Sequence, residues 1–287
     1  MQPTKERNHS GIHLQYKSEN FLFDCGEGIQ RQMRIAGLKI SKINKIFISH
    51  WHGDHAIGII GLMSSMGADQ SQQVLKIYGP EGSLNRFNLL KKAFPSMNTI
   101  KHKLIEVTEE GVLLSEKDYI IESYKLKHGM ECVGFSFREK DALKVDMKKV
   151  KKFGLKEGPI ICEFANGNNV KHNGKMIKAK DVTYKVVGKK IAYVADTRPC
   201  FGARKLAKES DLLIIESTFL EEDKKYAIKY DHMTAKESAE LARKAECKQV
   251  ILTHPSLRYK NTSVLTKEAK KYHKKVKFAK DFMVVEV

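Results

Sequence analysis

The chain has 287 residues, of which 41% are hydrophobic, and its 52 Lys and Arg against 34 Asp and Glu give a formal net charge of +18. This length accommodates one large α/β domain or two small ones. The longest apolar stretch, AIGIIGLMSSM, is too short to span a bilayer, and no signal peptide opens the sequence. The positive charge favours polyanionic partners, chiefly nucleic acid, although a lysine-rich proteome would produce the same excess.

The five cysteines are scattered and form no CxxC pair; they are Cys25, Cys132, Cys162, Cys200 and Cys247. An odd number of unpaired cysteines is typical of reduced thiols in a cytoplasmic protein. The pattern therefore predicts neither a disulfide framework nor a thiolate zinc site.

Predicted strands and helices alternate along the chain. Strands are expected at 21–25, 45–49, 74–79, 119–126, 132–137, 190–195, 211–217, 249–254 and 282–287. Helices are expected at 55–66, 82–94, 203–209, 234–246 and 264–274, with a capping box formed by Thr234 and Glu237. A short basic helix is also expected over 143–153, ended by Gly154. This order predicts one α/β domain with mixed sheets and a basic insertion.

A histidine-rich motif, FISHWHGDHAIGII, follows the predicted strand at 45–49. Alternate residues of a strand share a face, so His50 and His52 can converge on one ion. Gly53 permits a tight turn, after which Asp54 and His55 face the same place. Imidazole and carboxylate ligands suit Zn²⁺ or Mn²⁺. Because four ligands exceed the need of one catalytic ion, the motif predicts two metals roughly 3.5–4 Å apart with a shared hydroxide.

The excess positive charge is concentrated in one segment. Residues 138–190 contain 15 Lys and Arg but only 6 Asp and Glu, with Gly, Pro and Asn turns. Such a run is either an ordinary solvated surface or an arm that grips a phosphate backbone. Its composition alone does not separate the two.

SHWHGDH resembles the HxHxDH signature of the metallo-β-lactamase fold. The flanking FLFDCGEGIQRQM and AIGIIGLM resemble one branch of that superfamily, the ribonuclease Z or tRNA 3′-processing endoribonucleases. The resemblance covers nearly the whole chain. It implies an α/β fold, an αββα sandwich of two mixed sheets with a protruding basic arm. Residues 1–287 would form one such domain, with 139–180 as an inserted flexible arm.

The resemblance also implies two zinc ions and their ligands. KLKHGMECVGFSF supplies His128, YVADTRP supplies Asp196 and ILTHPSLRY supplies His254. One zinc would be held by His50, His52 and His128, and the other by Asp54, His55 and His254, with Asp196 as the bridge. Considered without the family, a solitary histidine is more often a hydrogen-bonded residue than a ligand. All three nevertheless lie at the C-terminal ends of predicted strands, where α/β folds usually build their sites.

The resemblance assigns the acid–base chemistry to IEST and HMT, which replace the HEAT and HST motifs of the family. Glu216 would orient His232, and the imidazolium of His232 would protonate the leaving 3′ oxygen. Asp54 would orient the nucleophile or take its proton. Ile215 and Met233 depart from the family pattern, whereas the glutamate, the histidine and the following threonine match it. The bland interpretation is a buried strand-end carboxylate and an exposed loop histidine.

In the family, an arm with a Gly-Pro signature clamps the tRNA elbow, and LKEGPI supplies Gly158 and Pro159. The nearby lysines are the expected phosphate contacts, because lysine neutralises backbone charge without reading sequence; they are Lys148, Lys149, Lys151 and Lys152. Double-helical RNA is recognised largely by shape, so the arm need not read bases.

The opening MQPTKERN matches the family loop P-T-x-x-R-N, but the strand that precedes this loop in the family is absent. We hypothesise a start codon assigned too late, because losing that strand would leave unpaired backbone in a sheet. Lys5 and Arg7 are expected phosphate binders near the cut site, although basic residues near a terminus are usually just solvated.

These features together predict a zinc endoribonuclease, with Mn²⁺ as a possible substitute, that removes the 3′ trailer of precursor tRNA after the discriminator nucleotide and leaves a 3′-hydroxyl. The resemblance implies a homodimer, for which the segment at 264–275 is one candidate surface. A small-ester hydrolase, a DNA nuclease of the same superfamily and a non-catalytic RNA-binding relative are the alternatives. The basic arm and HMT argue against the hydrolase, and the full set of seven ligands argues against a non-catalytic protein.

Overall fold

The computed structural model describes residues 2–287, which contain two large sheets. The first sheet has the order β1-β2-β3-β4-β5. Its strands are β1 (Ile12–Tyr16), β2 (Glu19–Phe23), β3 (Lys45–Phe47), β4 (Leu75–Pro80) and β5 (His102–Val107). β1 is antiparallel to β2, and the other neighbours are parallel, so the sheet is mixed as predicted.

The second sheet has the order β16-β15-β14-β13-β8-β7-β6. Its strands are β6 (Gly111–Ser115), β7 (Tyr119–Lys125), β8 (Val133–Glu139), β13 (Lys190–Val194), β14 (Leu212–Glu216), β15 (Gln249–Thr253) and β16 (Val276–Phe278). The strands from β13 to β16 run parallel, so their carboxyl ends share one edge of the sheet.

The two sheets face each other through an aromatic layer. Successive residues of a strand point to opposite faces. Phe21, Phe23 and Phe47 therefore point away from the helices, and Phe47 lies 5.3 Å from Phe135 of β8 between ring centroids. Phe23 lies 6.4 Å from Tyr193 of β13 in the same layer. The aromatic side chains exclude water between the sheets, which stabilises the strand ends that carry the site.

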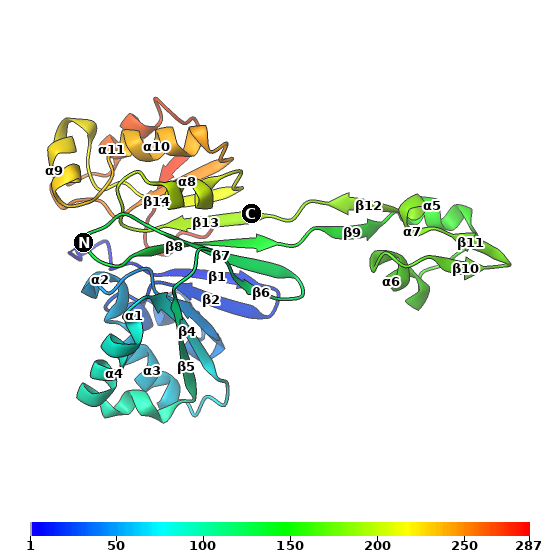
Figure 1. Cartoon of the computed structure of the whole chain (residues 1–287), viewed down its shortest axis with the longest axis horizontal. Coiled ribbons are helices and arrows are strands. Elements are labelled where there is room, and N and C mark those ends of the chain that lie inside the picture. The colour runs from blue at the N-terminus through cyan, green and yellow to red at the C-terminus, as the bar shows by residue number, and fades with distance from the viewer. Residues whose placement is uncertain (1) are drawn as a thin grey trace. The chain divides into compact units, whose positions relative to one another are not determined.

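Helices cover the outer face of each sheet (Figure 1). Beside the first sheet lie α1 (Ile29–Ile35), α2 (Gly53–Ala56), α3 (Ile59–Ala68) and α4 (Ser83–Ala93). Leu22 and Ile46, which alternate with the aromatic residues, pack there against Ile59 and Met63. Beside the second sheet lie α8 (Phe201–Ala207), α10 (Ala235–Lys244) and α11 (Ser263–Ala269). This arrangement is the predicted αββα sandwich. The remaining elements of this part are η1 (Ile40–Lys42), η2 (Pro95–Thr99), η3 (Glu221–Asp223) and α9 (Lys224–Lys229).

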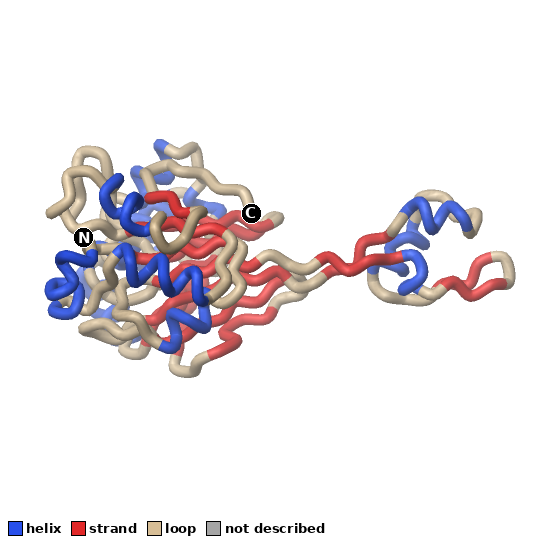
Figure 2. The backbone as a smooth tube through the Cα atoms, turned by 90° about the horizontal axis from the view of Figure 1, so that it is seen from above, coloured by secondary structure: helices blue, strands red, loops and turns tan. Residues whose placement is uncertain are grey.

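Residues 116–120 and 138–189 form a second compact unit, which contains both helices and short strands (Figure 2). Its elements are β9 (Ala142–Val145), α5 (Met147–Lys152), α6 (Pro159–Ala165), β10 (Val170–His172), β11 (Lys175–Ile177), α7 (Ala179–Val182) and β12 (Thr183–Val186). β9 pairs antiparallel with β12, and β10 with β11. Val150, Phe164 and Val182 are fully buried in a small core of the unit's own. None of the helices among residues 2–287 has the length and apolar character to cross a membrane.

Three secondary-structure predictions are wrong. The segment 282–287 forms no strand, and β16 at 276–278 takes the edge position beside β15 instead. The expected helix at 143–153 is a strand over its first residues, and only Met147–Lys152 is helical because Asp146 caps the new helix. The helix expected at 55–66 is interrupted near Gly58 and forms α2 and α3. A Cβ on Gly58 would lie 2.0 Å from the carbonyl oxygen of Gly26, so this close approach requires glycine.

Candidate active site

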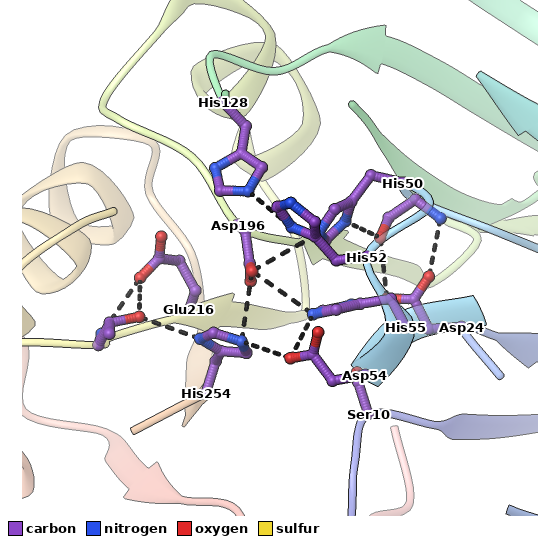
Figure 3. Close-up of polar contacts among 12 residues, drawn as sticks. Ser10, Asp24, His50, His52, Asp54, His55, His128, Asp196, Glu216 and His254 are labelled. Carbon is purple, nitrogen blue, oxygen red and sulfur yellow. Dashed lines mark hydrogen bonds and ion pairs between the residues drawn. The ribbon is translucent and has the colours of Figure 1, made fainter. Parts of the chain in front are cut away.

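The predicted polar residues gather where strands end, as Figure 3 shows. His50 follows β3, His128 follows β7, Asp196 follows β13 and His254 follows β15. Parallel strands bring their carboxyl ends to one edge of a sheet, and the two sheets of the sandwich place these edges side by side. Residues that are 200 positions apart, such as Asp54 and His254, therefore come into contact.

One group of donor atoms is formed by His50, His52, His128 and Asp196, whose ligand atoms all lie within 4.8 Å of one another. His50 Nε2 is 3.0 Å from His52 Nδ1 and 3.7 Å from Asp196 Oδ2. His128 Nε2 is 3.2 Å from the same His52 nitrogen. His52 thus presents Nδ1 to the group, whereas His50 and His128 present Nε2.

A second group of donor atoms, which also lie within 4.8 Å of one another, is formed by Asp54, His55 and His254. His254 Nε2 lies 3.3 Å from Asp54 Oδ2, and His55 Nε2 lies 3.5 Å from that oxygen. Both imidazoles also approach Asp196 Oδ2, at 3.3 Å for His254 and 3.4 Å for His55. Asp196 therefore touches both groups.

These donor sets fit two divalent cations. Two ligand atoms bound at about 2.0–2.1 Å to one tetrahedral zinc lie roughly 3.3 Å apart, which matches the separations above. Buried polar atoms normally find hydrogen-bond partners. Yet His55 Nε2 and Asp196 Oδ1 are buried and form no hydrogen bond within residues 2–287. Nitrogen and oxygen donors without a thiolate suit Zn²⁺ or Mn²⁺.

Protonation states within the first group favour metal binding. Burial lowers the pKa of His50 well below its usual value, and the neighbouring His55 lowers it further. Burial likewise lowers the pKa of His52. Because a histidine must be neutral to ligate a metal, both imidazoles are ready to bind.

Asp24 contacts the ring nitrogen of His55 that does not face the donor group. His55 Nδ1 lies 2.6 Å from Asp24 Oδ2, which also accepts hydrogen bonds from Ser49 Oγ at 2.9 Å and Tyr193 Oη at 2.5 Å. The backbone N–H of Ser49 donates to Asp24 Oδ1 at 2.7 Å. Asp24 is fully buried, and such carboxylate–histidine contacts fix the orientation of a metal ligand.

The other histidines have partners of the same kind on their second ring nitrogen. His50 Nδ1 lies 3.0 Å from Ser49 Oγ, and His254 Nδ1 lies 3.1 Å from Thr218 Oγ1. His128 Nδ1 lies 3.2 Å from the carbonyl oxygen of Asp231. The donor atoms that face the candidate metal positions are therefore oriented in advance.

The backbone adopts positive φ at three non-glycine residues of this site. Asp24 and His254 have φ of 58°, and Asp231 has φ of 56°. This left-handed conformation is uncommon outside glycine and persists where the surrounding contacts enforce it. The hydrogen bonds of Asp24 and His254 provide such contacts.

Glu216 and His232 form the predicted pair. Glu216 is fully buried at the end of β14, and His232 Nδ1 lies 2.9 Å from its Oε1. Burial opposes the charging of His232, but the Glu216 carboxylate outweighs burial and raises the pKa of His232 to about 9. The imidazole is therefore protonated near neutral pH in the metal-free protein. Met233 and Ile215, which depart from the family motifs, are buried core residues and do not disturb the pair.

A cavity of about 440 Å³ opens onto the site. His52, Asp54, His128, Asp196, His232 and His254 line it on one side, and Phe219, Tyr230, Pro255 and Leu257 supply apolar lining. The cavity thus reaches members of both donor groups and His232, whereas Glu216 stays buried behind His232.

The predicted RNA-binding residues are not members of the two donor groups. Lys5 is exposed and lines a groove of about 930 Å³ that shares Pro255, Ser256 and Leu257 with the cavity. Arg7 lines the same groove but donates to the carbonyl oxygen of Ala279 at 2.8 Å, so part of its guanidinium is already engaged. In the second unit, Pro159 begins α6 directly after Gly158. The chosen lysines of that unit are all exposed: Lys148, Lys149, Lys151 and Lys152.

Sequence reasoning missed the residues that support the site, namely Asp24, Ser49, Tyr193, Thr197, Arg198 and Thr218. Asp24 carried a signal, because a carboxylate directly after a buried apolar strand requires partners. The others carried none, since Ser, Thr and Tyr are unremarkable at strand ends.

Similar proteins place the chain in a family. It is 38% identical over 286 residues to the ribonuclease Z of Chlamydia muridarum, an alignment that covers 98% of this chain and 92% of that protein. The ribonuclease Z of Methanothermobacter thermautotrophicus is also 38% identical, with 99% of this chain and 93% of that protein covered. A family model described as "Anti-Pycsar protein Apyc1" matches residues 3–138, which is less than half of the chain.

Solved structures show the same fold. The short form of human tRNase Z superposes with a TM-score of 0.71 at 24% identity, covering 99% of this chain and 94% of that one. The metallo-β-lactamase fold protein YhfI of Bacillus subtilis gives 0.68 at 20% identity, covering 97% and 91%. The predicted fold class and the resemblance in sequence are thus confirmed. The chain belongs to the ribonuclease Z family.

Proposed function

We infer that this protein is a metal-dependent endoribonuclease that removes the 3′ trailer from precursor tRNA. The observation that carries this inference is the identity of 38% with ribonuclease Z proteins over nearly the whole chain. The geometry of the site agrees, since members of both donor groups and the proposed acid His232 line one cavity. Cleavage after the discriminator nucleotide would leave a 3′-hydroxyl on the tRNA.

We propose two Zn²⁺ ions per chain, with Mn²⁺ as a substitute. His50, His52 and His128 would hold one ion, Asp54, His55 and His254 the other, and Asp196 both. When bound, two such ions neutralise charge on the phosphodiester and supply a nucleophile at neutral pH. Asp196 Oδ1 and His55 Nε2, which are buried and form no hydrogen bond within residues 2–287, support this assignment, as do the separations among the donor atoms.

The chain's own residues move the protons. His232, held by Glu216, would donate a proton to the leaving 3′ oxygen, which is a poor leaving group as an alkoxide. Its raised pKa supports this role, because the imidazole carries the required proton at neutral pH. Asp54 lines the same cavity, where we propose that it orients the nucleophile or accepts its proton.

We propose that the second unit binds the tRNA. Lys148, Lys149, Lys151 and Lys152 are exposed on and around one short helix, so four ammonium groups are available to phosphates. The rigid start of α6 at Gly158 and Pro159 would support this surface. Lys5 and Arg7 line the groove that adjoins the cavity and are proposed phosphate contacts near the site, with Arg7 the weaker one because its guanidinium already donates to the carbonyl oxygen of Ala279.

We further propose that the protein acts in the cytoplasm as a homodimer. All five cysteines are free thiols, which agrees with a reducing compartment. The dimer is an expectation from the family. A measured mass of one chain in solution would contradict it.

The test is incubation of the purified, metal-loaded protein with a trailer-bearing precursor tRNA. We expect one cut near the acceptor stem that a chelator abolishes and that added Zn²⁺ or Mn²⁺ restores. An unstructured RNA of the same length and trailer sequence is the control, which we expect to remain intact. No cleavage of the precursor, or equal cleavage of both RNAs, would contradict the proposal.

A further inference from the structure

Arg198 connects the loop that carries His232 to the rest of the site. Its Nη1 donates to the carbonyl oxygen of His232 at 2.5 Å and to Glu237 Oε2 at 2.8 Å. Its Nη2 donates to Glu237 Oε1 at 2.6 Å. The guanidinium therefore donates two parallel hydrogen bonds to the Glu237 carboxylate and a third hydrogen bond to the backbone carbonyl of His232. The Arg198 and Glu237 side chains are only 14% and 12% exposed.

Glu237 is itself fixed to the same loop. It is the third residue of α10, and its Oε2 accepts the N–H of Thr234 at 3.1 Å in a capping box. Thr234 Oγ1 in turn accepts the N–H of Glu237 at 3.1 Å. Arg198 thus holds the loop at two points, directly at His232 and through the cap of α10, on both sides of Met233.

Thr197, the residue before Arg198, binds Glu216, the partner of His232. The backbone N–H of Thr197 donates to Glu216 Oε1 at 2.9 Å, which is the same oxygen that contacts His232 Nδ1. The segment Thr197–Arg198 therefore holds Glu216 by its backbone and the loop of His232 by its side chain. This segment therefore links the carboxylate to the loop of the imidazole, and loss of either contact would remove that link.

Arg198 does not serve as a direct contact for substrate phosphate. It is absent from the residues that line the cavity, and both terminal nitrogens of its guanidinium are engaged by Glu237 and His232. A lysine would not reproduce this arrangement, because an ammonium group lacks the planar fork that binds a carboxylate and a carbonyl together.

We propose that Arg198 is a positioning residue for proton transfer, which holds His232 at the distance and angle that Glu216 and the leaving oxygen require. This inference rests on the proposed function, in which His232 protonates the 3′ oxygen. Loss of Arg198 should therefore slow the cleavage of substrates whose leaving group needs a proton. Substrates whose leaving group is stable as an anion would be unaffected.

The test compares Arg198→Ala and Arg198→Lys on two substrates, precursor tRNA and bis(p-nitrophenyl) phosphate, whose nitrophenolate leaves without protonation. We expect Arg198→Ala to lower kcat for the precursor about 100-fold, the lower end of the usual range for general acid catalysis, with little change in KM. Hydrolysis of the aryl diester and the metal content should stay within about threefold of the wild type, and Arg198→Lys should be intermediate. Arg204→Ala, on the exposed side of neighbouring α8, is the matched control and should be unchanged.

A double-mutant cycle separates this role from a general structural one. If Arg198 acts through His232, the variant Arg198→Ala/His232→Ala should cleave the precursor no more slowly than His232→Ala alone. Multiplicative losses, or an equal loss on both substrates, would overturn the inference, as would full precursor activity in Arg198→Ala. Arg198→Lys keeps the test valid if the alanine variant does not fold.

A measurement without substrate distinguishes failure of this inference from failure of the proposed function. The Nδ1 proton shared with Glu216 should give a downfield proton resonance in the metal-free protein, identified by its loss in His232→Ala. We expect it to be lost or to exchange faster with water in Arg198→Ala and to remain in Arg204→Ala. An unchanged resonance would refute the positioning role whatever RNA the wild-type enzyme cleaves.

Discussion

His232 Nδ1 lies 2.9 Å from Glu216 Oε1, and this carboxylate has no freedom to rotate away. Its Oε1 also accepts the N–H of Thr197, and its Oε2 accepts the N–H and the hydroxyl of Thr218 at 3.1 and 2.7 Å. Thr218 Oγ1 lies 3.1 Å from His254 Nδ1. One buried carboxylate thus orients both the proposed acid and, through Thr218, a proposed metal ligand.

Replacing Glu216 should therefore impair proton transfer. Glu216→Gln keeps the volume but removes the charge that holds the imidazolium, and we expect kcat for precursor tRNA to fall about 100-fold or more. The aryl diester should be hydrolysed at close to the wild-type rate. Steady-state kinetics on the two substrates measure this difference. Glu246→Gln, an exposed carboxylate after α10, is the control, and an equal loss in that variant would discredit the interpretation.

The stability of the metal-free protein should depend on the same pair. The pKa of His232 is raised from 6.5 to about 9, so its contribution is fully present below pH 6.5 and is lost as pH rises through 9. The corresponding contribution to the free energy of unfolding is about 3 kcal/mol. The contribution of His55 to stability also falls as pH rises, because Asp196 and Asp24 overcome the effect of burial and raise the pKa of His55.

Urea unfolding of metal-free protein at pH 6.5 and pH 9.5 measures this change. We expect the wild type to lose stability over the interval and His232→Gln to lose less, with the difference between them assigned to His232. A wild-type protein that gains stability between these pH values would show that the sign is wrong.

Metal binding should be sensitive to Asp24, although it contributes no donor atom to either group. Asp24→Asn weakens the hold on His55 Nδ1, and loss of such supporting contacts typically reduces metal affinity about 10–100-fold. Titration of metal-free protein with Zn²⁺ measures the affinity. Asp69→Asn, which changes an exposed carboxylate at the end of α3, should bind Zn²⁺ as the wild type does.

Removal of a donor atom should have a larger effect. We expect His50→Ala to abolish cleavage at every RNA concentration.

The lysines of the second unit should affect binding rather than chemistry. We expect changing Lys148, Lys149, Lys151 and Lys152 to Gln to raise KM for precursor tRNA and to flatten its salt dependence, because fewer phosphate contacts are made. Hydrolysis of the aryl diester should not change.

The matched control for these lysines removes the same charge elsewhere. It changes the four exposed lysines that follow α11 to Gln: Lys270, Lys271, Lys274 and Lys275. An equal rise of KM in both variants would show that overall charge, and not the second unit, governs tRNA binding.

The site could be predicted largely because its residues follow strands. The motif from His50 to His55 is local, so its spacing alone predicts a metal site. The more distant His128, Asp196 and His254 were assigned by resemblance, and the structure brings them next to the motif. Their metal-ligating role remains a prediction that the zinc titration tests.

Long-range pairing explains what the sequence did not predict. Residues 142–145 form a strand only because 183–186 lie beside them, and local periodicity does not contain that partner. Arg198 likewise has no local sequence signal within YVADTRP, since its partners Glu237 and His232 follow more than 30 residues later.

The most direct test of the proposed reaction is the chemistry of the new RNA ends. Cleavage of a trailer-bearing precursor should give a tRNA with a 3′-hydroxyl after the discriminator nucleotide and a trailer with a 5′-phosphate. A precursor with a 2′-deoxy discriminator should be cut as well, because the proposed nucleophile is water and not the 2′-hydroxyl of the substrate. A 2′,3′-cyclic phosphate product, or a 2′-deoxy precursor that resists cleavage, would contradict the account.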